Sequence, residues 1–271
     1  PLQPKLSPGR GTSRMRKTMF EYKPPQDLLK NKTILITGAS DGIGRACANS
    51  FADHGATVIL LSRTQPKLEQ VYDEIEARHP GRVIIQPLDL RTAVSEDFKL
   101  LADSIDEQFG CLDGLLHNAA LLGARNPIEF YPDEDWKNLM QVNVNAPFLL
   151  TKVLLPVLSR ATDGRLLFTA SSVGRQGRAY WGGHGVSKFA IEGLMQTLAD
   201  ELQDTTSIRV NSINPGGTRT AMRREAYPAE DPNTQPEPEA LMPVYLYIMG
   251  PEGSGFHGQA IDVRGFTGAM Q

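Results

Sequence analysis

The chain has 271 residues, of which 40% are hydrophobic and 22% are charged, a composition typical of one large α/β domain. Its net charge is −3, and residues 1–18 contribute +5, so residues 19–271 carry −8. This acidic body argues against a nucleic-acid partner, and the lack of any run of about 18 apolar residues argues against a membrane span.

The basic residues at the start of the chain and the spacing of its cysteines and histidines bear on targeting and metal binding. Residues 1–18 have no apolar stretch, so we expect no signal peptide and interpret them as a solvated arm or an expression remnant. Residues 19–271 then make up the folded domain. The two cysteines lack CxxC spacing and the five histidines lack metal-ligand spacing, which predicts a reduced, cytoplasmic protein without a metal site.

From about residue 30, strand-like and helix-like segments alternate. The strand-like segments are 33–37, 56–62, 82–90, 112–120, 165–172 and 208–217, and the helix-like segments are 43–55, 66–78, 95–109, 133–158 and 182–203. This alternation predicts right-handed βαβ units and a single doubly wound, Rossmann-like α/β domain, with a parallel sheet of about seven strands and helices on both faces. The proline- and acid-rich segment 227–240 is predicted to be a mobile loop.

A glycine-rich loop, TGASDGIG from Thr37 to Gly44, follows the first strand and opens a helix. Glycines there let a pyrophosphate approach the backbone, whose N–H groups and helix dipole bind it. A lone glycine pattern also occurs in ordinary turns, but the strand before it and the helix after it favour a dinucleotide site.

The end of the second strand predicts the choice of dinucleotide. An acid at this place would bind a ribose 2′-hydroxyl and favour NAD, whereas ILLSRT offers Ser62 and Arg63. A guanidinium can hold a 2′-phosphate through two hydrogen bonds, so we predict NADP; the alternative is an ordinary exposed arginine.

Further motifs follow in a fixed order. They are LDL with Asp89, HNAA at 117–120, QVNVNAPF with Asn143, TASSVG with Ser171, GGHGVSK with Lys188, and NPGGTRT with Pro215 and Gly216. Together with the G-x3-G-x-G loop they resemble the short-chain dehydrogenase/reductase family over about residues 25–265. Segments such as SSVGRQGRA and NPGGTRTAM are most similar to the bacterial YciK-type oxidoreductases of that family.

The resemblance implies an oxidoreductase that moves hydride between NADP(H) and a small carbonyl or alcohol substrate. It implies that Ser171 holds the substrate oxygen and that Asn143 and Lys188 maintain a proton relay. The cofactor-binding residues that the loop, the second strand and the resemblance indicate are Gly38, Ser40, Asp41, Gly42, Ile43, Gly44, Ser62, Arg63, Asp89, Leu90, Asn118, Ala119, Lys188, Pro215, Gly216, Thr218 and Thr220.

One position departs from the family at the centre of the chemistry. His184 occupies the place of the family's catalytic tyrosine, four residues before Lys188 and on the same helix face. The neighbouring ammonium should lower the pKa of this imidazole below its usual value of about 6.5. We therefore expect a tolerable base but a poor acid at neutral pH, with reduction increasing as the pH falls toward about 6.

Two functional hypotheses follow from this substitution. The first is an enzyme in which His184 replaces tyrosine at a cost in rate; the second is a catalytically silent dinucleotide-binding protein that senses redox state or acts as a scaffold. Tyr180 is a weaker candidate for the missing acid, and we expect Tyr180 and Trp181 to line the substrate cleft. Arg175 and Gln176 either face the substrate or form an exposed loop pair.

The segment 133–158 predicts self-association. Its apolar residues leave no fully polar helix face: Trp136, Leu139, Met140, Val142, Val144, Phe148, Leu149, Leu150, Val153, Leu154, Leu155 and Val157. A helix that is apolar all round must be covered on both sides, and the sheet covers only one. We therefore expect a homodimer or homotetramer, which is also what the resemblance implies.

Overall fold

A computed structural model describes residues 19–269, so the predicted basic arm at 1–18 lies outside the described residues. The strands are β1 Thr33–Thr37, β2 Thr57–Ser62, β3 Val83–Pro87, β4 Gly114–His117, β5 Arg165–Thr169, β6 Arg209–Asn214 and β7 Ala260–Asp262. The helices are α1 Gly42–Asp53, α2 Gln65–Glu76, α3 Ser95–Phe109, α4 Asp133–Met140, α5 Ala146–Leu158, α6 Gly182–Leu202, α7 Ala221–Ala226 and α8 Met242–Met249.

The seven strands form one parallel sheet in the order β3-β2-β1-β4-β5-β6-β7, which confirms the predicted doubly wound fold. All five residues of β1 are buried, as expected for a strand covered on both faces. The strand order reverses between β1 and β4. In open parallel sheets, ligands bind beyond the carboxyl ends of the strands at this reversal.

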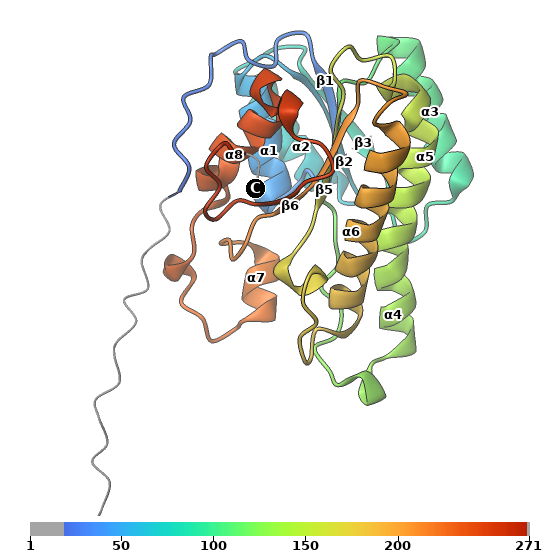
Figure 1. The fold of residues 1–271 in the computed structure, drawn as a ribbon, viewed down its shortest axis with the longest axis vertical. Helices are drawn as coiled ribbons and strands as arrows, with labels where there is room; N and C mark the ends of the chain where they lie inside the picture. The colour runs from blue at the N-terminus through green and yellow to red at the C-terminus, as the bar shows by residue number, and fades with distance from the viewer. Residues whose placement is uncertain (1–18, 270–271) are drawn as a thin grey trace, which may run out of the picture.

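Two apolar cores lie on opposite faces of the sheet. Helices α1, α2 and α8 pack on one face, and α3, α5 and α6 pack on the other (Figure 1). Phe51 and Tyr245 lie in the first core, and Phe98 and Phe168 lie in the second. Both cores extend into the turns that follow the strands, at Ala39 in the first and at Leu90 in the second, and these contacts fix the turns that form the site.

Several strands are shorter than the sequence pattern indicated. β3 ends at Pro87 rather than 90, β5 at Thr169 rather than 172, and β6 at Asn214 rather than 217. The apolar pattern continues into the following turns because those turns line a half-buried cleft. Periodicity records burial and therefore does not mark where the hydrogen-bonded ladder stops.

The predicted helix 133–158 is interrupted. A π-helical turn, Gln141–Asn145, separates α4 from α5 and contains Asn143. By length and composition this 26-residue run is the one helix in the described part of the chain that could cross a membrane, although half of its most apolar window is buried within the fold. Leu150, Leu154 and Leu158 pack in the core under the sheet, so burial within the fold accounts for the apolar residues on this side of the helix.

Candidate active site

A cleft of about 930 Å³ opens beyond the carboxyl ends of the strands. Nearly all of the predicted site residues line it: Gly38, Ser40, Asp41, Gly42, Ile43, Ser62, Arg63, Asp89, Leu90, Asn118, Ala119, Ser171, His184, Lys188, Pro215, Gly216, Thr218 and Thr220. Gly44 and Asn143 are the two that do not. The tertiary structure thus brings together residues that are up to 182 positions apart in the chain.

The glycine loop fits a phosphate cradle. Gly38 has a φ of +67°, and a Cβ added there would lie 2.9 Å from the Cα of Ala119, so only glycine suits this turn. A Cβ on Gly44 would overlap the carbonyl oxygen of Gly38. Gly44 therefore serves the close packing of α1 against the loop, while Gly38 and Gly42 lie on the cleft surface.

One end of the cleft is rich in cations and hydroxyls. The Ser40 and Ser62 hydroxyls are 2.8 Å apart, and Arg63 lies beside them on the cleft wall. Asp41 accepts a hydrogen bond from the backbone N–H of Gly42 and pairs with Lys67 at 3.3 Å. The carboxylate of Asp41 is thus paired with the ammonium of Lys67 on α2, and the guanidinium of Arg63 is a second cation at this end of the cleft.

The β4 turn holds the glycine loop from the other side. Thr37 Oγ1 accepts hydrogen bonds from the backbone N–H groups of Asn118 and Ala119, both at 3.0 Å, and Asn118 Nδ2 donates to the carbonyl oxygen of Thr37. His117, the departure from the family turn, is buried, stacked on Phe168 and bonded to Thr151. Burial lowers its pKa to about 3, so it is a neutral core residue.

Ser171 lies at the carboxyl end of β5 on the cleft wall, as predicted. Its Oγ accepts only a long contact, 3.5 Å, from the backbone N–H of Val173. The hydroxyl proton therefore stays available to donate to an oxygen in the cleft.

His184 is buried at the start of α6 and lines the same cleft. Its Nδ1 lies 3.0 Å from the carbonyl oxygen of Leu121. A carbonyl can only accept, so Nδ1 carries the proton and Nε2 keeps a lone pair. Burial first, then the ammonium of Lys188, lowers the pKa of His184 to about 4.

This value corrects the expected pH dependence. An imidazole with a pKa of about 4 is still neutral at pH 6, so the predicted increase in its acid form belongs near pH 4 rather than pH 6. Desolvation inside the fold, which sequence spacing does not reveal, is the larger cause.

Lys188 follows His184 by one turn of α6 and is also buried. Its Nζ donates to the carbonyl oxygen of Thr169 at 2.7 Å. Burial lowers the pKa of Lys188 to about 8, and the carboxylate of Glu192 opposes that shift. The ammonium therefore remains mostly charged at pH 7.

Asn143 stands behind the cleft. Its Oδ1 accepts from the N–H of Leu121, and its Nδ2 donates to the carbonyl oxygen of Leu121 and to Ser187 Oγ. The backbone of Leu121 is thereby held where its carbonyl meets His184. Sequence reasoning missed Leu121, because a backbone contribution leaves no trace in side-chain type.

Comparison with known proteins places this geometry in a family. Residues 32–231 match the family model described as short chain dehydrogenase. The chain belongs to the short-chain dehydrogenase family. It is 51% identical to the oxidoreductase YciK of Escherichia coli K12, over 90% of this chain and 96% of that protein.

Two solved structures extend the comparison. A short-chain dehydrogenase of Shigella flexneri complexed with NADP is 50% identical, with a TM-score of 0.86 over 88% of this chain and 99% of the other. One of Escherichia coli CFT073 complexed with NADPH is 51% identical, with a TM-score of 0.86 over 89% and 100%. The resemblance predicted from the motifs is confirmed, including its YciK-type character.

The structure of this short-chain dehydrogenase also shows which of Tyr180, Trp181 and Arg175 line the cleft. Trp181 lines the cleft, but Tyr180 does not; Tyr180 is 57% exposed to solvent in a turn before α6. That exposure argues against Tyr180 as the missing acid. Arg175 does not line the cleft either, because it forms ion pairs with Glu192 and Asp262.

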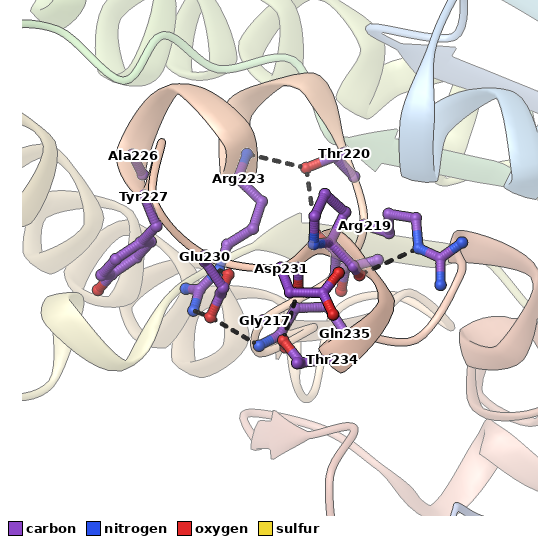
Figure 2. Close-up of polar contacts among 12 residues, drawn as sticks. Gly217, Arg219, Thr220, Arg223, Ala226, Tyr227, Glu230, Asp231, Thr234 and Gln235 are labelled. Carbon is purple, nitrogen blue, oxygen red and sulfur yellow. Dashed lines mark hydrogen bonds and ion pairs between the residues drawn. The ribbon is translucent and has the colours of Figure 1, made fainter.

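The segment after β6 forms the outer wall of the cleft. Residues 227–240 are a loop with two short 3₁₀ turns, Pro232–Thr234 and Pro238–Leu241. Its other acids are exposed, but Glu230 pairs with Arg223 at 2.6 Å and accepts from Gln235 at 2.9 Å (Figure 2). Thr220 caps α7 by accepting from the N–H of Arg223. The interpretation of 227–240 as a mobile loop hid Tyr227, which lines the cleft. Met222 on the preceding helix α7 lines it too and was also missed.

Proposed function

We propose that this protein is an NADP(H)-dependent oxidoreductase that transfers hydride between nicotinamide and a carbonyl or alcohol substrate. The observation that carries the proposal is one cleft lined by Ser171, His184 and Lys188 together with the glycine loop after β1. Solved relatives complexed with NADP and NADPH support the choice of cofactor.

The residues after β2 suit a cofactor with a 2′-phosphate. Arg63 lies on the cleft wall beside the paired hydroxyls of Ser40 and Ser62, at the position after β2 where an acid would bind a free 2′-hydroxyl. Lys67 supplies a second cation nearby, although Asp41 neutralises part of it. The turn residues Asp89, Leu90, Asn118, Pro215, Gly216, Thr218 and Thr220 would hold the rest of the cofactor.

The reacting end requires a donor for the substrate oxygen and a source of protons. When bound, NADPH supplies the hydride. Ser171 donates a hydrogen bond to the substrate oxygen, and the charged Lys188 stabilises the negative charge that develops there. Asn143 holds the backbone that orients His184. At neutral pH, His184 Nε2 is unprotonated and would accept the proton of an alcohol, acting as a weak base because its pKa is about 4.

One observation favours the second hypothesis, a catalytically silent NADP-binding protein. The proton on His184 Nδ1 is committed to the carbonyl of Leu121, and a pKa of about 4 leaves Nε2 unprotonated at neutral pH. Carbonyl reduction then lacks a proton donor at neutral pH, while the end of the cleft that would bind the cofactor is unaffected.

The variant His184→Tyr separates the two hypotheses. With Ser171 and Lys188 in place, restoring a phenol should raise carbonyl reduction at pH 7 by roughly 10²–10⁴ and leave the affinity for NADPH within about threefold. The reduction rate is measured by steady-state NADPH oxidation on a panel of carbonyl compounds, and the affinity for NADPH is measured by nicotinamide fluorescence titration. A tyrosine variant that binds NADPH yet stays inert on the whole panel would establish the silent protein.

We also propose that the protein is a homo-oligomer. Phe148 on α5 and Val186 and Phe189 on α6 expose 48%, 44% and 46% of their surface. The two helices lie side by side on the outside of the sheet (Figure 1), so these side chains suit a covering subunit. Light scattering of the parent and of a Phe148→Glu/Phe189→Glu variant tests this, since the charges should yield a monomer.

A further inference from the structure

The end of the cleft beside His184 is apolar. Six side chains from three separate segments form a small cluster there, and all six line the cleft: Leu122, Val173, Trp181, Met222, Ala226 and Tyr227. Of the charged side chains that line this end, Asp135, Arg178 and Glu225 are exposed to solvent, and the half-buried Arg223 is paired with Glu230. A ligand that enters this end therefore meets a polar rim and an apolar interior.

A half-buried arginine lies behind this apolar wall. Arg125 does not line the cleft, but its guanidinium carbon is 4.1 Å from the ring centroid of Trp181 and 5.6 Å from that of Tyr227. Its Nε donates to the carbonyl oxygen of Tyr180 and its Nη1 to that of Ala226, both at 3.0 Å. Among residues 19–269, no carboxylate lies within ion-pair distance of it.

These contacts tie together three chain segments. The carbonyl of Tyr180 precedes α6, the carbonyl of Ala226 ends α7, and Arg125 belongs to the loop between β4 and α4. A planar guanidinium can donate in two directions and stack on a ring at the same time, which an ammonium cannot do. Arg125 therefore contacts both the Trp181 and the Tyr227 ring, whose centroids are 6.1 Å apart.

The other side of the wall is fixed by a second arginine. Arg223 lies 3.8 Å from the ring centroid of Tyr227 and forms two 2.6 Å hydrogen bonds with Glu230. Figure 2 shows Arg223 of α7 close to Tyr227 and Glu230 of the segment that follows this helix. Trp181 in turn lies 5.7 Å from the ring of His184. The apolar wall thus runs from His184 through Trp181 to Tyr227.

We propose that Arg125 is a specificity-determining positioning residue: it holds Trp181 and Tyr227 as the apolar wall against which the uncharged, apolar body of a carbonyl substrate packs. The proposal rests on the proposed oxidoreductase function and adds the substrate class, an apolar ketone or aldehyde rather than a polyhydroxylated or charged one.

Ligand binding without turnover tests this proposal. The chain has two tryptophans, so a Trp136→Phe background makes Trp181 the sole reporter. With NADP⁺ saturating, no reduction can occur, and Trp181 emission is titrated with cyclohexanone as the apolar probe and with dihydroxyacetone as the polar one. We expect the parent to bind cyclohexanone more tightly than dihydroxyacetone.

In the variant Arg125→Met, cyclohexanone affinity should fall roughly fivefold or more, because both carbonyl contacts and the stacking are lost. Trp181 emission should shift, while NADPH affinity should change less than about twofold. Arg125→Lys should also weaken binding, since an ammonium cannot make the same set of contacts. Arg224→Met is the matched control: Arg224 is an exposed arginine on α7 that does not line this cleft, and its side chain makes no hydrogen bond or ion pair within residues 19–269, so the variant should behave like the parent.

Equal affinity for the two probes in the parent would overturn the substrate class. Unchanged cyclohexanone binding and emission in Arg125→Met would overturn the role of Arg125. An equal loss of NADPH and cyclohexanone affinity would show general disruption and would also count against it. If binding follows the expectation but no variant ever turns over, the proposed enzyme fails while the inference about Arg125 stands.

Discussion

At the scale of single residues, surroundings decide what each side chain can do. His117 and His184 are both buried imidazoles near Lys188, and both have strongly lowered pKa values. His117 stacks on Phe168 inside the core, whereas His184 lines the cleft. The same chemistry therefore gives packing at one position and a candidate proton acceptor at the other. Exposure to the cleft, not residue type, makes the difference.

The charge at Arg63 gives a test at this scale. NADPH should bind more tightly than NADH by about 1.5–3 kcal/mol, the usual contribution of a hydrogen bond to a charged group. Arg63→Asp should reverse the order, because a carboxylate repels the 2′-phosphate and accepts from a 2′-hydroxyl. Fluorescence titration with both cofactors measures this, and equal affinities in the parent would refute the assignment of Arg63.

At the scale of elements, polar contacts join the pieces that carry the site. Arg175, just past Ser171, pairs with Glu192 on α6 at 3.0 Å and with Asp262 on β7 at 2.9 Å. Glu192 is buried and also accepts from Ser212 on β6 at 2.6 Å. The turn after β5 is thereby attached to the helix of His184 and to the last two strands.

Breaking this junction should cost stability. Arg175→Met leaves the buried carboxylate of Glu192 with one partner fewer, and we expect the free energy of unfolding to fall by about 2 kcal/mol, less than for a fully buried pair because Arg175 is partly exposed. The double variant Arg175→Met/Glu192→Gln should recover part of that loss. Urea unfolding measures both, with Arg178→Met as the control that should change by less than about 0.5 kcal/mol.

At the scale of the whole molecule, the buried histidines make the fold sensitive to acid. His117 and His184 have folded pKa values of about 3 and about 4, below the usual 6.5 of an unfolded chain. The unfolded state therefore binds more protons between those values, and stability is lost as the pH falls below 6.5.

Between pH 7.5 and pH 5, each of these histidines should remove about 2 kcal/mol from the free energy of unfolding. Urea unfolding across this range checks the expectation. The His184→Tyr variant should lose about half as much as the parent, because one of the two titrating groups is gone. An identical pH slope in parent and variant would contradict the lowered pKa of His184.

The sequence by itself determined the fold class and most of the cleft. Alternating strands and helices require a doubly wound sheet, and in such a sheet the turns after the strands meet at one edge. Motif residues as distant as Gly38 and Thr220 could therefore be assigned to one site before any coordinates. The identity of His184 was equally plain, because the residues around it fix its position in the family motif.

Only the tertiary structure decided how those residues behave. Desolvation lowers the pKa of His184 further than its neighbour Lys188 does, and burial depends on every element packed around α6. The roles of Leu121, which acts through its backbone, and of Arg125, which acts through carbonyls and ring faces, have no signature in residue spacing. Sequence patterns record which side chains are apolar or charged, whereas contacts between distant segments decide what those charges meet.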